Sequence, residues 1–380
     1  MPAIGIAQDF KSDLEITDTS DIFWEQLYFP DTADIKCIST NEAGDIFIGT
    51  GGNENDGLYR STDFGETWDF VLNCNNHGII SIDINPQGDI FIGKLGFDNF
   101  QASYDNGDTW TILNRPPYTT GNITKIHCQG NDTIYIGTWE DGGGLLSRST
   151  DGGYSWDSLF LSQVNPGDHI TDIVISSGGD IYLSIMGYFN NTGGVYRSVD
   201  NGNTWEFLGL MNHQVGAMAI NSNNEIFTGD WYTMLDEVPG IYALYNESDT
   251  LQIIRATNGV TDMAINSDGH IFVLNGLGIL RSMDNGESFE YVNEGITSSF
   301  FDIHIDNEGF AYISRYNELY RSVNTTVAIN EQVPPGHFFN VYPNPFSDNI
   351  NIRGQKTDRL IKSVTIFNIS LLFSNSISRK

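Results

Sequence analysis

Positive charge is scarce in this chain of 380 residues. Lys and Arg together number 18 against 49 Asp and Glu, which gives a formal net charge of −31 at pH 7. A surface with so little positive charge repels polyanions, so nucleic acids and anionic membrane surfaces are excluded as partners. The acidic residues are spread along the sequence rather than gathered in a tail, which is typical of a solvated surface.

Cysteine and histidine are also few. The three cysteines, Cys37, Cys74 and Cys128, have neither a paired spacing nor the spacing of metal ligands. Because their number is odd and low, disulfides do not hold the fold, and we expect them to be small buried side chains. The seven histidines are scattered and form no His-x-x-x-His pair. We therefore predict no metal site and no other cofactor.

Long apolar runs are absent as well. No stretch approaches the roughly 20 apolar residues of a membrane-spanning helix, so no membrane span is predicted. The chain is instead rich in glycine, with 40 residues, and in aromatic residues, which make up 12% of it. This composition is typical of all-β structure with many turns.

One short phrase, Ser-x-Asp-x-Gly-x-x-Trp, recurs along the chain. Its first four Asp residues are 42, 46 and 49 residues apart, and the next follows after 84, which equals two repeats with one phrase erased. These residues are Asp63, Asp105, Asp151, Asp200 and Asp284. A repeat of about 40 to 50 residues with four short strands in each unit is typical of a β-propeller.

Two hydrophobic strands joined by a polar turn precede each phrase. In the clearest example, the turn Asn85-Pro-Gln-Gly88 combines a Pro that fixes its own φ with a Gly that tolerates a positive one. The same strand-turn-strand pattern occurs in seven units, numbered one to seven in chain order, at residues 35–49, 79–93, 123–137, 170–183, 215–229, 260–273 and 300–313.

The Asp of each phrase is expected to close its own hairpin turn. A short carboxylate accepts hydrogen bonds from nearby backbone N–H groups, the Gly adopts a conformation that other residues avoid, and the Trp packs beneath. A role as metal ligand or catalytic acid is disfavoured, because one residue repeated in every unit cannot converge on a single site. The arginines that precede the phrases are assigned to the scaffold for the same reason: Arg60, Arg148, Arg197, Arg281 and Arg321.

The last unit lacks its fourth strand, and the beginning of the chain offers a replacement. Unit seven stops at Ser322, whereas Phe23 to Tyr28 matches the outer strand that starts at Trp68 in unit one. Pairing the two would close the ring and cover exposed strand edges. We predict an all-β, seven-bladed β-propeller of four-stranded antiparallel blades over residues 21–328, closed by its N-terminal strand and monomeric.

These motifs resemble the Asp-box, or BNR-repeat, propellers, a family that includes sialidases, xyloglucan-active glycosidases and sortilin-like receptors. A sialidase would need three arginines around the substrate carboxylate, with a Tyr nucleophile, a Glu and an Asp acid. Outside the repeat positions the propeller has Arg115, Arg255 and Arg315, which are possible anion-binding residues. The xyloglucan enzymes resemble two propellers around a cleft, and one is present here. The resemblance therefore leaves enzyme activity open and favours a protein without it.

Both ends of the chain indicate export. A Pro-rich linker at 329–338 leads to residues 339–380, where the run Tyr342-Pro-Asn-Pro345 resembles the opening of the C-terminal sorting domain of the type IX secretion system of Bacteroidota. That family continues with further strands and a basic end, so a partial β-sandwich is expected; the alternative is a small accessory β-domain. Residues 1–20 contain Ala3 to Gln8, similar to the tail of a signal peptide. We expect export through the periplasm to the cell surface or the exterior, with the secretion machinery as a partner.

Strand order predicts which face of the propeller binds. The loops after the second strands and the crossovers between units share one face, and they vary more than the turns on the other face. They carry aromatic and acidic residues in units two to five: Phe97, Phe100, Trp139, Glu140, Asp141, Tyr188, Phe189, Asp230, Trp231 and Tyr232. Such side chains suit CH–π contacts and hydrogen bonds to a glycan, and they equally suit an extracellular protein. The structural alternative is that the rings pack on neighbouring loops.

Three functions remain open on these residues. The first is binding of a glycan or protein, and the second is glycoside hydrolysis of the sialidase or xyloglucanase kind. For hydrolysis, Glu140 or Asp141 could pair with Asp230 as acid and base. The third is a structural adhesion module without catalysis.

Overall fold

The computed structural model describes residues 23–52, 56–96, 100–116, 121–139, 146–159, 168–187, 193–233, 239–245, 250–257, 259–294, 296, 300–326, 340–342 and 351–353. The chain divides into two compact units, 1–328 and 329–380. In the C-terminal one, β29 (Asn340–Tyr342) pairs antiparallel with β30 (Asn351–Arg353). The remainder of the predicted sorting domain lies outside the described residues.

The N-terminal unit is all-β in its described residues, where the strands form four antiparallel sheets of four strands and one sheet of twelve. Unit one contains β2 (Asp34–Thr40), β3 (Ile46–Gly51), β4 (Gly57–Ser61) and β5 (Asp69–Asn73). Unit two contains β6 (Ile79–Ile84), β7 (Ile90–Lys94), β8 (Phe100–Ser103) and β9 (Thr111–Ile112). Unit six contains β22 (Asp262–Ile265), β23 (Ile271–Asn275), β24 (Gly278–Ser282) and β25 (Glu290–Tyr291).

Units three, four and five repeat this order within one continuous sheet. They contain β10 (Asn122–Gln129), β11 (Thr133–Trp139), β12 (Leu146–Ser149) and β13 (Asp157–Leu159); β14 (His169–Ile175), β15 (Ile181–Met186), β16 (Gly194–Ser198) and β17 (Glu206–Gly209); and β18 (His213–Ile220), β19 (Ile226–Thr233), β20 (Gly240–Leu244) and β21 (Gln252–Ala256). Single pairs join the three groups, Trp139 with His169 and Met186 with Gln214. If each group of four strands is one blade, the ring has the seven blades predicted. That count treats the two single pairs as the boundaries between blades.

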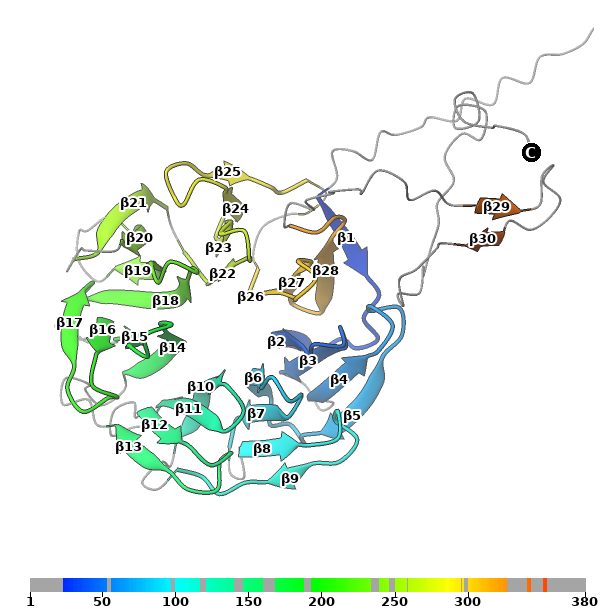
Figure 1. Cartoon of the computed structure of the whole chain (residues 1–380), viewed down its shortest axis with the longest axis horizontal. Coiled ribbons are helices and arrows are strands. Elements are labelled where there is room, and N and C mark those ends of the chain that lie inside the picture. The colour runs from blue at the N-terminus through cyan, green and yellow to red at the C-terminus, as the bar shows by residue number, and fades with distance from the viewer. Residues whose placement is uncertain are drawn as a thin grey trace, which may run out of the picture. The chain divides into compact units, whose positions relative to one another are not determined.

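The two ends of the N-terminal unit meet in its last sheet, as predicted. This sheet consists of β26 (Asp302–Ile305), β27 (Ala311–Arg315), β28 (Glu318–Ser322) and β1 (Trp24–Leu27). Trp24 pairs with Ser322, and Leu27 pairs with Leu319. The Trp24 indole is buried and donates a hydrogen bond to the Val292 carbonyl at 2.7 Å. Figure 1 shows these strands completing a ring of sheets around a central space.

Close contact between neighbouring sheets explains the hydrophobic second strands. Ile46 and Ile48 of β3 pack toward unit seven, whereas Phe47 between them packs toward unit two. A strand covered on both faces is hydrophobic throughout. Gly49 then lets unit two approach, because a Cβ there would lie 2.7 Å from Ile79 Cγ2.

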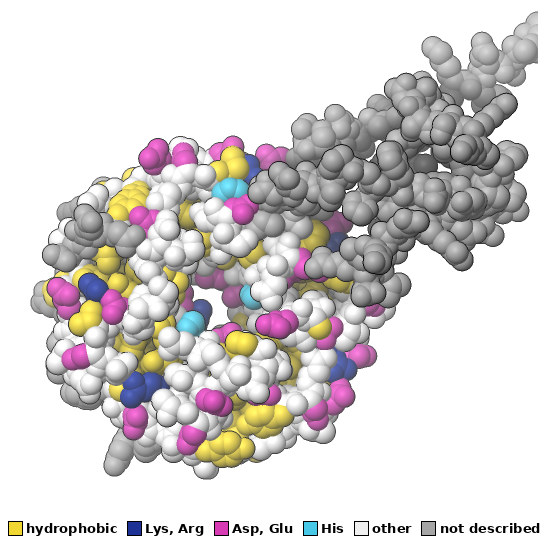
Figure 2. Space-filling view, in the orientation of Figure 1, with side chains coloured by type: hydrophobic (Ala, Val, Ile, Leu, Met, Phe, Trp, Pro, Cys, Tyr) yellow, Lys and Arg dark blue, Asp and Glu magenta, His cyan; other side chains and the backbone are white. Residues whose placement is uncertain are grey.

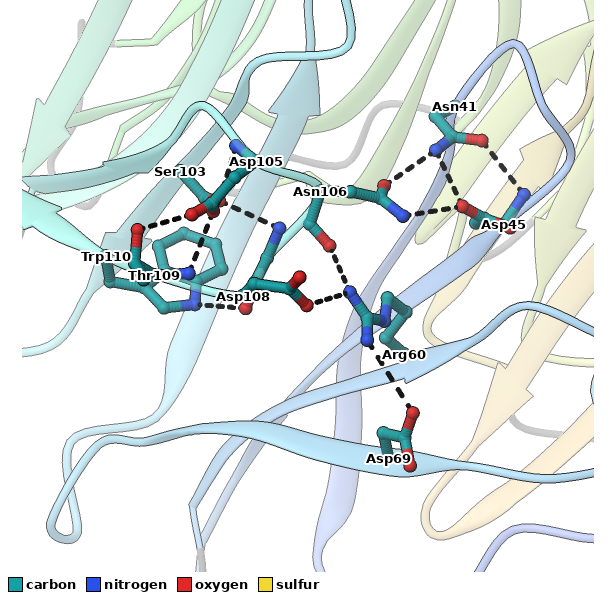
Figure 3. Close-up of polar contacts among 11 residues, drawn as sticks. Asn41, Asp45, Arg60, Asp69, Ser103, Asp105, Asn106, Asp108, Thr109 and Trp110 are labelled. Atoms are coloured by element: carbon teal, nitrogen blue, oxygen red, sulfur yellow. Dashed lines mark hydrogen bonds and ion pairs between the residues drawn. The ribbon is translucent and has the colours of Figure 1, made fainter.

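In each phrase the Asp side chain is bound within its own turn. Ser103 Oγ donates to Asp105 Oδ1 at 2.8 Å, and the Thr109 N–H and hydroxyl donate to the two carboxylate oxygens (Figure 3). The next two residues, Asn106 and Gly107, have positive φ angles of 60° and 90°. The same bonds recur at Asp63, Asp151, Asp200 and Asp284. Hydrogen bonding lowers the pKa of each carboxyl, to about 2 for Asp151.

The same turns also fasten one sheet to the next. Asn106 of unit two donates to Asp45 of unit one at 2.8 Å and accepts a hydrogen bond from Asn41 at 2.9 Å (Figure 3). Arg60 of unit one bonds the Asn106 carbonyl at 2.6 Å and Asp108 at 2.8 Å. These contacts assign Arg60 and the turn polar groups to the framework of the ring.

All three cysteines are free, with Cys37 and Cys74 buried and Cys128 partly buried. Burial raises the pKa of the Cys37 thiol well above its usual range. Among the described residues, no helix is long and apolar enough to cross a membrane.

Candidate functional site

Register places a set of apolar side chains at one end of the ring. Gly93, Gly137, Gly229 and Ser314 of the second strands pair with equivalent residues of the first strands. Two positions further along the chain are Leu95, Trp139, Trp231 and Tyr316, and all four side chains are exposed. Tyr232 and Phe301 are also exposed, and we call these six residues the loop-side rim. The rim lies on the face opposite the box turns, which are the turns formed by the Ser-x-Asp-x-Gly-x-x-Trp phrases.

The two tryptophans of the rim each lean on the following unit. Trp139 ends β11, and its ring lies 5.8 Å from the ring of His169, the first residue of β14. Trp231 lies beside Gly259, where a Cβ would come 3.4 Å from the indole Cδ1. Each indole is nonetheless substantially exposed, 44% for Trp139 and 56% for Trp231. The rings are thus supported on one side and open to solvent on the other.

Phe301 and Tyr316 continue the rim on unit seven. Their rings meet edge to face, with centroids 5.2 Å apart. The Lys36 ammonium lies 5.9 Å from the Phe301 centroid and 3.0 Å from the Asp34 carboxylate. Neither aromatic residue was among the predicted binding residues. Aligning the second strands of all units would have identified Tyr316, because it occupies the position of Trp139.

Two predicted contact residues are corrected. Phe100 is fully buried: its ring stacks on Phe91 at 6.1 Å and meets Trp156 edge to face at 5.6 Å. The strand β8 begins at this residue, so its side chain enters the core between sheets. Asp230 is also fully buried, and its carboxylate is bonded to His213 Nδ1 at 2.6 Å and to the Gly240 N–H at 2.6 Å.

Five other predicted residues lie outside the described residues: Phe97, Glu140, Asp141, Tyr188 and Phe189. Of the predicted acid–base pair, Glu140 or Asp141 with Asp230, the structure describes only Asp230. Its side chain is fully buried.

The three arginines outside the repeats have separate partners. Arg115 bonds the Gly121 carbonyl at 2.6 Å, and Arg255 bonds the Phe289 carbonyl at 3.1 Å. Arg315 pairs with Glu318 at 3.1 Å. The strands β9, β21 and β27, which hold or precede these residues, lie at separate points of the ring (Figure 1). The arrangement does not bring the guanidinium groups around one carboxylate.

A cavity of about 370 Å³ runs through the centre of the ring, lined by the first strands of all units. Figure 2 shows this hollow, with basic, acidic and histidine side chains at its wall. The pairings place one residue of each first strand in the same layer: Cys37, Ser81, Lys125, Asp172, Ala217, Asp262 and Asp302. We call its four charged members, Lys125, Asp172, Asp262 and Asp302, the channel cluster.

The carboxylates of the channel cluster fasten the sheets together. Asp172 accepts a hydrogen bond from the Met218 N–H at 3.0 Å, and Asp262 accepts one from the Ile303 N–H at 2.8 Å. Asp302 does the same with the Ile38 N–H at 2.9 Å. Each bond joins one first strand to the next.

The titration of these groups reflects burial and mutual repulsion. Burial raises the pKa of Asp262 to about 6, against the effect of the Lys125 ammonium. Burial and the neighbouring Asp262 carboxylate raise the pKa of Asp302 well above its usual range. Burial alone would lower the pKa of Lys125, but Asp172 and Asp262 raise it. The nearest ion pair joins Lys125 Nζ to Asp172 Oδ1 at 2.8 Å.

A second polar layer lies farther from the rim and contains two histidines. His304 is bonded to the Thr40 hydroxyl at 2.8 Å, and burial followed by the Lys125 charge lowers its pKa to about 4. Burial also lowers the pKa of His127. In the described part of the chain, no group of three or more His, Cys, Asp or Glu side chains could hold a metal ion.

Comparison with known proteins supports the fold. The chain is 26% identical over 264 residues to the photosystem II assembly lipoprotein Ycf48 of Synechococcus sp. strain CC9902, covering 66% of this chain and 73% of that protein. Its structure matches that of YCF48 bound to D1 peptide with a TM-score of 0.61 at 18% identity, over 79% of this chain and 97% of the other. The N-terminal unit is a β-propeller.

Two further similarities concern larger proteins. The chain is 30% identical over 172 residues to the xyloglucanase Xgh74A of Acetivibrio thermocellus, covering 45% of this chain but 17% of the enzyme. PorZ, a surface component of the type IX secretion system of Porphyromonas gingivalis, matches with a TM-score of 0.61 at 14% identity, over 84% of this chain and 50% of PorZ. No family model matches the chain. The structural likenesses are below 25% identity, so they establish the propeller fold alone.

Proposed function

We propose that this propeller is a binding protein of the cell surface or exterior that holds a glycan or a protein on its loop-side rim. The observation that carries the proposal is the exposure of Trp139 and Trp231 at equivalent positions of units three and five. Large aromatic side chains left open on one face mark interaction surfaces. Support from the other side of each indole limits its freedom, so little side-chain entropy is lost on binding.

Both ligand classes occur among similar proteins. One relative is named a xyloglucanase, and one structural neighbour is bound to a peptide. Aromatic faces stack on sugar rings and also anchor protein partners. The rim aromatics therefore suit either ligand class.

A glycan array and a peptide array probed with the full chain test the proposal. We expect a Trp139→Ala, Trp231→Ala double variant to lose at least about tenfold in affinity for whatever ligand is found, since buried aromatic anchors dominate interfaces. The matched control replaces Tyr104 and Tyr154, exposed aromatic residues of the box turns, with Ala. Equal loss in both double variants, or none in the first, would overturn the assignment of the face.

Glycoside hydrolysis is the second candidate, because the 172-residue match is to a xyloglucanase. Three of the described carboxylates are poorly placed for it. Asp230 is buried against His213, while Asp262 and Asp302 are engaged by backbone N–H groups inside the channel. We expect no release of reducing ends from xyloglucan and no cleavage of a fluorogenic sialoside by the purified chain.

We also propose that residues 339–380 direct export by the type IX machinery. The run Tyr342-Pro-Asn-Pro345 and the likeness of the propeller to PorZ support this. In a bacterium with that secretion system, the full chain is expected at the cell surface, whereas a chain that ends at residue 328 should stay in the periplasm. Protease accessibility on intact cells measures the difference.

A further inference from the structure

The loop-side rim borders the opening of the central channel. Phe301 belongs to the rim and also lines the cavity. The next residue along the chain, Asp302, belongs to the channel cluster, and Asp262 likewise follows the lining residue Thr261. All first strands run in the same direction from this face. A ligand side chain that enters the channel beside Phe301 therefore reaches the channel cluster at the very next residue, Asp302.

The channel cluster contains more carboxyl groups than ammonium groups. Three carboxyl groups share its layer with a single ammonium group, and that group is bonded to Asp172 at 2.8 Å. The hydrogen bonds to Asp262 come from the N–H groups of Met263 and Ile303, which are neutral donors. Asp302 likewise accepts from the Ile38 N–H. A second cation near Asp262 and Asp302 would balance the layer.

Space for a side chain is present. The cavity of about 370 Å³ is at the lower end of the range for ligand pockets, so it would admit an extended side chain rather than a polymer. Its wall combines the channel cluster with uncharged residues such as Thr124, Thr171 and Thr261. The chain as a whole, with a net charge of −31, attracts positively charged partners over a long range.

We propose that the loop-side rim and the channel opening together bind a polypeptide segment in which a Lys or Arg side chain is flanked by apolar residues. The apolar residues pack on Phe301 and the neighbouring rim aromatics, and the cationic side chain enters the channel toward Asp262 and Asp302. This inference rests on the proposed binding function of the rim. A neutral glycan is disfavoured, because it has no group to balance the excess carboxylate.

The experiment is a positional scan of N-acetylated hexapeptides against the full chain, with Lys, Arg, norleucine and Glu compared at each position. The expected result is selection of Lys or Arg at one position and of apolar residues beside it. Replacing that Lys with norleucine should weaken binding at least about tenfold, as loss of one partner of a buried charge pair does. Rising salt should weaken the Lys peptide more than the norleucine peptide.

A variant test locates the charge. In an Asp262→Asn, Asp302→Asn variant, the amide oxygens can still accept the backbone N–H groups, so the sheets stay joined while two carboxylates are lost. Binding of the Lys peptide should fall about tenfold or more, and binding of the norleucine peptide should stay within about twofold. Asp83→Asn is the matched control, since Asp83 is a channel carboxyl of the other polar layer that accepts the Cys128 N–H.

The outcomes separate this inference from the proposed function. Equal affinity for the Lys and norleucine peptides, with both lost in the Trp139→Ala, Trp231→Ala variant, would reject the channel site and keep the rim. Binding of glycans with no peptide selected would reject the polypeptide partner and also keep the rim. If the double Asn variant does not fold, the salt and norleucine comparisons on the unmodified chain decide.

Discussion

The Asp302 carboxylate accepts a hydrogen bond from the Ile38 N–H at 2.9 Å, which joins the last sheet of the propeller to the first. The bond lies at the inner edge of the ring, whereas the pairing of β1 with β28 closes the ring at its outer edge. The ring is thus closed by two separate contacts, a backbone ladder at its outer edge and a side-chain hydrogen bond inside the channel.

Replacing Asp302 with Ala is expected to destabilise the propeller by about 1 to 3 kcal/mol, because the Ile38 N–H would be left without an acceptor next to a buried side chain. The matched variant, Asp302→Asn, keeps an acceptor oxygen and removes a carboxyl group whose ionisation is opposed by burial and by the neighbouring Asp262. Its free energy of unfolding at neutral pH should equal or exceed that of the unmodified chain. Urea unfolding measures both, and similar losses in the two variants would contradict the role of the hydrogen bond.

Local repeats made the framework predictable from the sequence. The Ser, Asp, Gly and Thr or Ser of each box form their turn from residues within a few positions, so identical letters produce identical bonds. The match between Trp24 and Trp68 likewise located the closing strand, because the residues of a strand show which position of the repeat it occupies.

Residues whose environment comes from distant parts of the chain were harder to predict. Phe100 lies next to a loop in sequence, but its place in the core depends on Phe91 of the neighbouring strand and on Trp156 of the next unit. The channel cluster was missed because Lys125, Asp262 and Asp302 meet only once the ring is closed. Aligning the first strands of all repeats would have put these three residues in one layer from the sequence alone.

The close approach of neighbouring sheets gives a second prediction. At Gly137, a Cβ would lie 2.7 Å from Ile170 Cγ2 and 2.9 Å from Ile170 Cβ. Gly137→Ala must push units three and four apart or shift Ile170, which should cost about 1 to 3 kcal/mol of unfolding free energy. In contrast, a Cβ at Gly178 would meet nothing nearer than Ser176 Oγ at 3.7 Å.

Gly178→Ala is therefore the control, and it should be neutral or stabilising by about 0.5 kcal/mol because Ala restricts the unfolded chain. Urea midpoints of the two variants compare them directly. Equal midpoints would mean that the spacing between units three and four adapts to an added methyl group.

The titration of Asp262 gives the last prediction. Its folded pKa of about 6 lies above the value of about 3.9 in an unfolded chain, so the folded state binds the proton more tightly. A group of this kind stabilises the fold most below the unfolded pKa, and that contribution is lost as the pH rises from about 4 to about 6. Among the groups around it, Lys125 favours its ionisation and Asp172 opposes it, and Asp302 is a further carboxyl neighbour in the same layer.

Asp262→Asn removes this titrating group. Between the two ends of that pH interval, the unfolding free energy of the variant should therefore fall by less than that of the unmodified chain, with a difference on the order of 2 kcal/mol. Urea unfolding of the variant and the unmodified chain at pH 4.5 and pH 7 measures it. The box carboxyls, such as Asp151 with a pKa of about 2, stay ionised in the folded protein throughout and contribute equally to both proteins. Parallel pH profiles for the two proteins would show that Asp262 is already ionised at pH 4.5, and the channel would then contain enough positive charge without a ligand.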